Sequence, residues 1–545
     1  MLPVTQQTQS LLTQDGTRLD ADIYTPEGEG PFPVLLMRQP YGRAIASTVV
    51  YAHPRWYAAQ GYIVVIQDVR GRGSSLGDFD LFAHEVQDGA ETVAWAAALP
   101  KSSGQVGMYG FSYQGMTQLF AAAAQPKALK TLCPAMVAYD LREDWAYEGE
   151  AFCLQMGLGW AVQLAAETAR RQGHMDAYRS LYTAARTPLS CDPVCARSKL
   201  LNQLARDSFY HDWLAPPTPD YWRQRSPRHY IDAVAQLDLP MLHLGGWYDT
   251  YLRGTLRLYQ ELAIRSHQPQ HLWVGPWPHI PWGRQVGEID FGPEAVSPID
   301  RLQIRWFDQF LKGKATGLLT EPPVQLFELG HNHWRSLPAF PNPKPTAYWL
   351  ASDGLAGMRE TSGSLQAKPP EAPYATADIL VHDPWRPVQA VGGHAVFPAG
   401  PYNRAAMDSR SDVLTYSLNL EQDLHLAGSA TVHLQCQADA PSFDMSAVLS
   451  QRYPDGRVMP LAQGYRRLDN HQDELVSLTL QPICAQIPAG HGLRLSVSGA
   501  CYPAYPVNPG TGEPLTEGRL MEARVISITV DKGRSRLELP LVQWP

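Results

Sequence analysis

The first third of the chain alternates short, continuously apolar runs with longer helical patterns. Residues 33–38 (PVLLMR), 62–67 (YIVVIQ) and 106–109 (VGMY) are rich in β-branched or aromatic residues, which is typical of strands buried on both faces of a parallel sheet. Residues 85–98 and 114–125 carry helical patterns. Strands that alternate with helices predict βαβ units and a three-layer α/β fold.

The pattern becomes mostly helical between residues 135 and 228, with many Ala, Leu, Gln and Arg residues. Strand patterns return at 240–245 (PMLHLG) and 271–275 (HLWVG). We therefore expect one α/β-hydrolase core formed by residues 1–134 and 229–341. Residues 135–228 would be a helical cap inserted above the sheet.

The last part of the chain, residues 342–545, shows short strand patterns separated by Gly, Pro, Asp and Asn turns, and residues 338–345 form a Pro-rich linker pattern. The strand patterns cover residues 414–418, 430–435, 443–450, 475–480, 492–497 and 523–530. Regularly spaced short strands without long helices predict a C-terminal β-sandwich or jelly roll.

Composition excludes several classes of partner. The chain has 545 residues, too many for one core, and a net charge of −8 with no basic run, which argues against nucleic acid. No stretch of about 20 apolar residues predicts a membrane span. The first residues lack a signal-peptide pattern, so we expect a cytoplasmic protein. The oligomeric state stays open.

Cysteine usage does not indicate a disulfide framework, because the seven cysteines are few and odd in number. Cys191 and Cys195 lie close together in the sequence, but no further ligands for a metal cluster near them. They are interpreted as structural thiols, with a bridge as the alternative, and no metal site is expected.

The segment 104–118 (GQVGMYGFSYQGMTQ) places Ser112 between a predicted strand and a predicted helix. This context matches the nucleophile elbow of α/β-hydrolases, which presents a serine Oγ above the sheet and the next backbone N–H, that of Tyr113, to a developing oxyanion. The second glycine, Gly115, follows Ser112 by three residues instead of two. The alternative is a tight strand–helix connection without catalytic function.

A nucleophilic serine needs a histidine base oriented by a carboxylate, in the chain order Ser, Asp or Glu, His. Asp249 and His279 each follow one of the two late strands, where open α/β sheets place their sites. Alternatively, Asp249 would be a helix N-cap and His279 a packed surface residue. His243 and His271, which lie in or beside strands, are interpreted as structural.

The loop after residues 33–38 begins with residues 39–42 (QPYG), where many hydrolases keep a second oxyanion donor. Tyr41 could supply its phenol hydroxyl. Its position alone favours packing under the cap.

These motifs together resemble the bacterial cocaine esterases (CocE/NonD-type hydrolases) and their relatives, the α-amino acid ester hydrolases and X-prolyl dipeptidyl aminopeptidases. The matching segments span nearly the whole chain. They are residues 38–41, 68–75 (DVRGRGSS), 110–115, 245–249, 275–279, 306–313, 409–415 (SRSDVLT) and 503–510 (PAYPVNPG).

The resemblance implies a catalytic triad of Ser112, Asp249 and His279. It also implies an oxyanion hole formed by the Tyr41 hydroxyl and the Tyr113 N–H. The implied fold is an α/β-hydrolase core with a helical cap and a C-terminal jelly roll, and the implied chemistry needs no cofactor.

The residues after Asp249 indicate which substrates the site prefers. The α-amino acid ester hydrolases carry acidic residues there that bind the substrate ammonium, whereas this chain has residues 250–252 (TYL). A buried ammonium without a carboxylate is costly, so free α-amino substrates are disfavoured unless Glu148 or Glu150 serves instead. These glutamates are interpreted as solvated or helix-supporting.

Three aromatic residues of the cap, Trp145, Phe152 and Trp160, would line an apolar acyl or aryl pocket, or else pack within the helical bundle. The leading hypothesis is an esterase for small, fairly apolar esters. The alternative within the same chemistry is an X-Pro dipeptidyl peptidase or another amide or acyl hydrolase. A non-catalytic carbohydrate-binding module is the alternative of another class, because jelly rolls often hold carbohydrate.

Overall fold

The computed structural model describes residues 2–186, 192–369, 377–469 and 474–544. Its N-terminal part is built on a ten-stranded sheet in the order β1-β2-β4-β3-β5-β6-β9-β10-β13-β14. The strands are Val4–Leu12 (β1), Arg18–Pro26 (β2), Phe32–Gln39 (β3), Ile63–Asp68 (β4), Ser102–Phe111 (β5), Leu129–Ala135 (β6), Met241–Tyr248 (β9), Gln270–Pro278 (β10), Val324–Glu328 (β13) and His333–Leu337 (β14).

The neighbours from β4 to β13 pair in parallel, and the outer pairs β1·β2, β2·β4 and β13·β14 are antiparallel. The central strands are apolar and buried on both faces because helices cover each face of the sheet. The sequence predicted β3, β4, β5, β9 and β10, but it missed β2, β6, β13 and β14. It did not predict β1, whose polar residues are mostly exposed and which is held by its pairing with β2.

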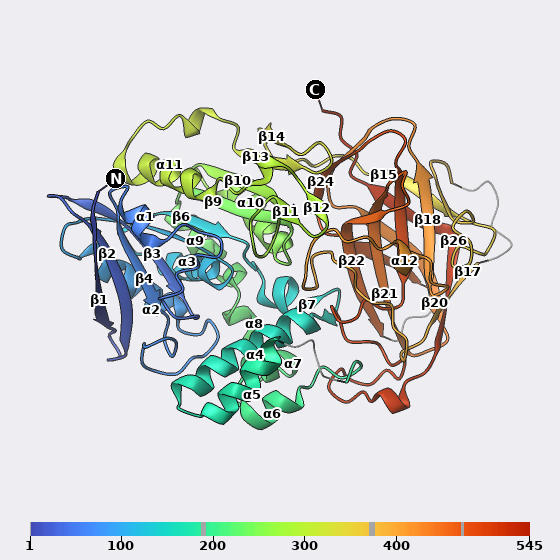
Figure 1. Ribbon diagram of the computed structural model, residues 1–545, viewed down its shortest axis with the longest axis horizontal. Helices are drawn as coiled ribbons and strands as arrows, with labels where there is room; N and C mark the ends of the chain where they lie inside the picture. Colours follow the sequence, from blue (N-terminus) through green and yellow to red (C-terminus); the bar gives the residue numbers. More distant parts are fainter. Residues whose placement is uncertain (1, 187–191, 370–376, 470–473, 545) are drawn as a thin grey trace.

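Helices form a layer on each face of this sheet. Glu85–Ala97 (α2), Tyr113–Ala123 (α3), Ile231–Leu237 (α9) and Leu252–Arg265 (α10) share one hydrophobic core, whereas Pro54–Ala58 (α1) and Ile299–Lys312 (α11) share another. Figure 1 shows α11 at the top of the core and α2 on its lower side. This three-layer α/β arrangement confirms the predicted fold class of the core.

Besides α9, the described part of the segment between β6 and β9 carries helices that form a separate bundle at the bottom of Figure 1: Leu154–Arg171 (α4), Met175–Arg186 (α5), Lys199–Leu204 (α6), Phe209–Leu214 (α7) and Tyr221–Gln224 (α8). The short strands Tyr147–Glu148 (β7) and Ala151–Phe152 (β8) precede them. Helix α4 packs on α5, α6 and α7. No described helix combines the length and apolarity that crossing a membrane requires.

The C-terminal part is a second, β-rich layer structure, at the right of Figure 1. Its main sheet runs β22-β21-β25-β18-β16-β15-β26-β20-β23, with β17 paired to β26. These strands are Thr346–Ala351 (β15), Ser364–Gln366 (β16), Asp378–His382 (β17), Val413–Asn419 (β18), Thr431–Ala438 (β20), Ser442–Arg452 (β21), Val458–Asp469 (β22), Glu474–Thr479 (β23), Gly492–Ser498 (β25) and Ile526–Leu539 (β26). Leu424–Gly428 (β19) and Ile483–Ile487 (β24) form a separate pair. The arrangement is jelly-roll-like, as expected.

This part differs from the sequence prediction, which missed β15, β16, β17, β19, β22 and β24. The strand expected at residues 523–530 starts at Ile526 and continues to Leu539, because its second half pairs with β15 and with β20. Strand β22 was not predicted, although its pairing with β21 buries most of it. The second half of β26 depends on partners distant in the sequence, whereas β22 pairs with β21, the strand that directly precedes it.

Candidate active site

Strand β5 ends at Phe111 and helix α3 begins at Tyr113, so Ser112 occupies the turn between them. Its backbone has φ 60° and ψ −129°, a conformation that is strained for a residue with a side chain. The Ser112 N–H donates to Ala135 O at 2.9 Å, which fixes the turn against β6. The side chain lines a large cavity between the core, the cap and the C-terminal part.

A close approach of helix α3 to β6 explains why the second glycine of the elbow, Gly115, follows the serine by three residues. A Cβ at this position would lie 2.3 Å from Val137 Cγ1 and 2.9 Å from Ala135 O. Helix α3 therefore crosses β6 at Gly115, and only glycine allows this approach. Gln118, one turn further along, bonds Gly110 O, Cys133 O and Cys133 N and ties the helix to both strands.

Asp249 and His279 follow β9 and β10, two neighbouring parallel strands. His279 Nδ1 lies 2.8 Å from Asp249 Oδ1, and the carboxylate is fully buried. Because an ionised carboxylate only accepts, Nδ1 carries the proton and Nε2 is left as the basic nitrogen. Gln481, a residue of the C-terminal part that the sequence did not single out, donates to Asp249 O at 2.5 Å.

The imidazole of His279 lies beside the nucleophile turn. Its ring centroid is 5.2 Å from that of Phe111 and 4.9 Å from that of Tyr251, and His279 lines the same cavity as Ser112. Within the described residues, no direct hydrogen bond between Ser112 Oγ and His279 is present. Such bonds in hydrolases are often long without substrate and tighten when it binds.

Tyr41 lies just after β3 and lines the cavity with Ser112. Burial raises the pKa of Tyr41 to about 12, and the Trp160 indole, the Arg72 charge and the Ser112 hydroxyl partly oppose this rise. The phenol is therefore protonated and able to donate at neutral pH. The structure thus places Tyr41 beside the nucleophile, where a second oxyanion donor is expected.

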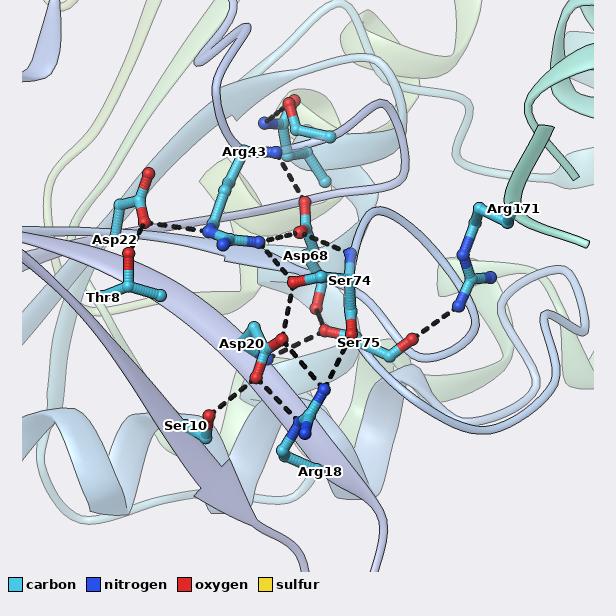
Figure 2. A network of polar contacts seen from close by, with 12 residues as sticks. Thr8, Ser10, Arg18, Asp20, Asp22, Arg43, Asp68, Ser74, Ser75 and Arg171 are labelled. Atoms are coloured by element: carbon cyan, nitrogen blue, oxygen red, sulfur yellow. Dashed lines mark hydrogen bonds and ion pairs between the residues drawn. The ribbon is translucent and has the colours of Figure 1, made fainter. Parts of the chain in front are cut away.

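Polar contacts hold the loop that follows Tyr41. Gln39 Nε2 donates to Gly42 O at 2.9 Å, and the Arg43 N–H donates to Asp68 Oδ1 at 2.5 Å. The Arg43 guanidinium also binds Asp68 and Asp22, as Figure 2 shows. These bonds fix the backbone on the C-terminal side of Tyr41.

Tyr113 presents its two polar groups in different directions. Its hydroxyl donates to Glu85 Oε1 at 2.8 Å, and Glu85 in turn pairs with Arg38. Its side chain is therefore buried in the core instead of in the cavity. The Tyr113 N–H belongs to the first turn of α3, where helix N–H groups lack an acceptor within the helix, so it is free to bind an oxyanion.

The three aromatic residues expected in the pocket have different locations. Trp145 and Trp160 line the cavity, with ring centroids 4.6 Å apart. Phe152 is fully buried against Tyr147 and Tyr210, and it is not among the residues that line the cavity. Of the two alternatives for Phe152, the structure therefore shows packing, because its ring fills the interior of the cap.

Glu148 and Glu150 were both expected to be solvated or helix-supporting. Glu150 is exposed and pairs with Arg142, but the expectation for Glu148 is wrong. Glu148 is buried and lies 2.6 Å from Arg253, 3.0 Å from His394 and 2.7 Å from the Tyr505 hydroxyl. Burial opposes its ionisation, but Arg253 and His394 outweigh burial and hold the pKa of Glu148 below its usual range.

This Glu148 cluster joins the cap, helix α10 and two loops of the C-terminal part, which is why the sequence could not reveal it. His394 also lines the cavity and is therefore a site residue that sequence reasoning missed. Its neighbours in the sequence, Val396 and Phe397, line the cavity too. The C-terminal part thus supplies one wall of the site.

The described residues contain no group of His, Cys, Asp and Glu side chains placed to hold a metal ion. Cys195 lies 3.7 Å from Thr516 O, whereas Cys191 is outside the described residues. His243 and His271 are buried in the sheet layers away from the cavity lining. Burial lowers the pKa of each to about 4, in agreement with a structural role.

Comparisons with known proteins agree with this architecture. Residues 15–281 match the family model described as X-Pro dipeptidyl-peptidase (S15 family), and residues 316–537 match its C-terminal non-catalytic domain. A cocaine esterase of Rhodococcus sp. (strain MB1 Bresler) is 28% identical over 571 residues, which cover 97% of each protein.

Solved structures share the whole fold. An aminopeptidase from a Thaumarchaeota archaeon superposes with a TM-score of 0.82 at 21% identity, covering 99% of this chain and 97% of that one. An α-amino acid ester hydrolase gives a TM-score of 0.80 at 22% identity with the same coverage. Because the two X-Pro dipeptidyl-peptidase models together match residues 15–281 and 316–537, the chain belongs to the X-Pro dipeptidyl-peptidase (S15) family.

Proposed function

We propose that the protein is a serine hydrolase that cleaves small, fairly apolar carboxylic esters through Ser112, His279 and Asp249. One observation carries this proposal: His279, which lies 2.8 Å from the buried Asp249, lines the same cavity as the strained Ser112 turn. An imidazole oriented by a carboxylate beside an elbow serine is the arrangement that activates a hydroxyl for acyl transfer.

The catalytic cycle follows from these positions. His279 Nε2 takes the Ser112 proton as Oγ attacks the ester carbonyl, and Asp249 stabilises the resulting imidazolium through Nδ1–H. The Tyr41 hydroxyl and the Tyr113 N–H donate to the oxyanion. The imidazolium then gives its proton to the departing alcohol, which leaves an acyl-enzyme. Water, deprotonated by His279, releases the acid and restores Ser112.

The cavity entrance favours apolar substrates. Ile45, Val49, Ile280 and Phe397 all line the cavity and are 53%, 54%, 39% and 66% exposed. Apolar side chains gathered at one opening are a typical mark of a binding surface for apolar groups. An ester of an aromatic or aliphatic acid suits this entrance, and one relative is named a cocaine esterase.

The Glu148 cluster bears on substrates with a free α-amino group. Glu148 is the buried carboxylate next to the cavity residue His394, but Arg253 already neutralises it. It is not a free partner for a substrate ammonium, and burying an unpaired ammonium is costly. This argues for esters without a charged amine.

The match to the S15 family model supports X-Pro dipeptidyl peptidase activity as the second candidate.

A substrate panel separates the two candidates. We expect purified protein to hydrolyse short-chain and aromatic p-nitrophenyl esters, with little turnover of X-Pro p-nitroanilides. Ser112→Ala should abolish turnover while retaining the fold, as judged by circular dichroism. Strong anilide turnover with weak ester turnover would favour the peptidase, and ligand binding without any hydrolysis would favour a carbohydrate-binding module.

A further inference from the structure

Arg72 is a buried cation that the proposed mechanism does not use. It lies in the loop after β4, is 1% exposed and belongs to the cavity lining. Three other arginines of this region each have a carboxylate partner: Arg38, Arg43 and Arg70. No ion pair joins Arg72 to a carboxylate within the described part of the chain. Burying a charge without a directly paired counter-ion costs free energy, and hydrogen bonds offset only part of that cost. A function for Arg72 would account for its burial.

The hydrogen bonds of Arg72 connect the oxyanion loop to the cap. Its Nε donates to Pro40 O at 2.9 Å, and its Nη1 donates to Leu164 O at 3.2 Å and to Thr168 Oγ1 at 3.0 Å in helix α4. Pro40 directly precedes Tyr41. Arg72 therefore fixes the backbone on the N-terminal side of Tyr41, opposite the contacts that fix it on the C-terminal side.

The guanidinium keeps its charge at neutral pH. Burial, with a smaller effect of Arg171, lowers the pKa of Arg72 only to about 10, because the Glu167 charge and, to a smaller extent, Tyr113 and Tyr41 favour the charged form. The reciprocal effect is that the Arg72 charge lowers the pKa of the Tyr41 phenol. A nearby cation makes a phenol a stronger hydrogen-bond donor, and this effect is large where water is excluded. Nη2 of Arg72 has no hydrogen-bond partner among the described residues.

We propose that Arg72 is a positioning residue of the oxyanion hole, which holds Tyr41 in place through the Pro40 carbonyl and strengthens its hydroxyl as a donor. The proposal rests on the proposed esterase mechanism. In this role the buried Arg72 charge is held in place before the reaction, on the side of the substrate carbonyl oxygen that becomes negative. Its stabilising effect is therefore larger in the transition state than in the ground state.

The test compares Arg72→Met and Arg72→Lys with Arg171→Met as a matched control. Arg171 also joins helix α4 to the loop after β4, because its Nη2 donates to Ser75 O at 2.6 Å (Figure 2). Among the described residues, no hydrogen bond or ion pair joins Arg171 to residues 40–42. Steady-state ester hydrolysis is measured, and active sites are counted by titration with a fluorophosphonate so that kcat refers to folded enzyme.

We expect Arg72→Met to lower kcat about 10- to 100-fold with KM changed less than about threefold. Arg72→Lys, which keeps the charge but cannot span Pro40 and α4, should fall between Met and the native enzyme. Affinity for an arylboronic acid, which forms an anionic tetrahedral adduct with Ser112, should weaken in parallel with kcat. Arg171→Met should retain native kcat.

A double-mutant cycle with Tyr41→Phe separates positioning from a general structural role. If Arg72 acts through Tyr41, replacing Arg72 in the Tyr41→Phe background should lower kcat much less than in the native background. If Arg72→Met does not fold, the Arg72→Lys cycle gives the same comparison. Additive losses, an effect confined to KM, or an equal loss in Arg171→Met would overturn the proposal.

Failure of the underlying mechanism is recognised separately. If the native enzyme is not labelled by the fluorophosphonate and hydrolyses no ester, the proposed function itself is wrong. If the native enzyme is labelled and active but both Arg72 variants keep native kcat, only the role of Arg72 is wrong.

Discussion

Gly115→Ala tests whether the close crossing of helix α3 over β6 sets the position of Ser112. The added Cβ would lie 2.9 Å from Ala135 O, and ordinary contacts begin at 3.4 Å, so backbone must move by about 0.5 Å. Val137 can rotate away, but the Ala135 carbonyl is part of β6 and accepts the Ser112 N–H. The displacement therefore falls on α3 and on the Tyr113 N–H.

A displacement of this size should lower kcat about tenfold, because an error of about 1 Å can cost about 10²-fold. Overpacking should also lower the free energy of unfolding by about 1–3 kcal/mol. The assay is ester hydrolysis per titrated active site together with thermal unfolding. Gly283→Ala is the control, since no heavy atom lies within 4 Å of its added Cβ. Native kcat in Gly115→Ala, with α3 unmoved in a crystal structure, would refute the reasoning.

Three further predictions address the donor, the orienting carboxylate and a buried imidazole. Tyr41→Phe should lower kcat about 10²- to 10³-fold in steady-state ester hydrolysis; an unchanged kcat would remove Tyr41 from the mechanism. Asp249→Asn should lower kcat about 10⁴-fold, because the amide favours the wrong imidazole tautomer, and a small loss in the same assay would contradict the assigned role. Burial lowers the pKa of His243 from 6.5 to about 4, so the unfolded chain binds the extra proton. The contribution of His243 to the free energy of unfolding is therefore fully present above pH 6.5 and is lost as the pH falls toward 4. The loss at pH 5 is about 2 kcal/mol. Thermal unfolding at pH 7 and 5 should show a smaller drop for His243→Gln than for the native chain, and equal drops would contradict the prediction.

Features set by local pattern were predictable from the sequence. Strands β3, β4 and β5 are continuous apolar runs, and such runs are buried wherever helices cover both faces of a sheet. The strand–serine–helix context located Ser112, and the equivalent positions of Asp249 and His279 after neighbouring strands located the rest of the predicted triad. The structure brings the latter two into contact.

Features set by contacts between distant segments were not predictable. Glu148 looked solvated until Arg253, His394 and Tyr505 were placed around it. Arg72 belongs to a motif matched by resemblance, but its bond to Pro40 O exists only after β3 and β4 are paired. One sequence carries no signal for such convergence, because each residue has ordinary neighbours along the chain.

The central claim is that the Ser112 hydroxyl becomes covalently attached to the substrate acyl group. Rapid acid quenching of the Asp249→Asn variant during turnover of a p-nitrophenyl ester, followed by intact-mass and peptide mass spectrometry, tests it directly. The account predicts one acyl group per chain, located on Ser112, and none in the Ser112→Ala variant. An acyl group on another residue, or unchanged ester hydrolysis by Ser112→Ala, would contradict it.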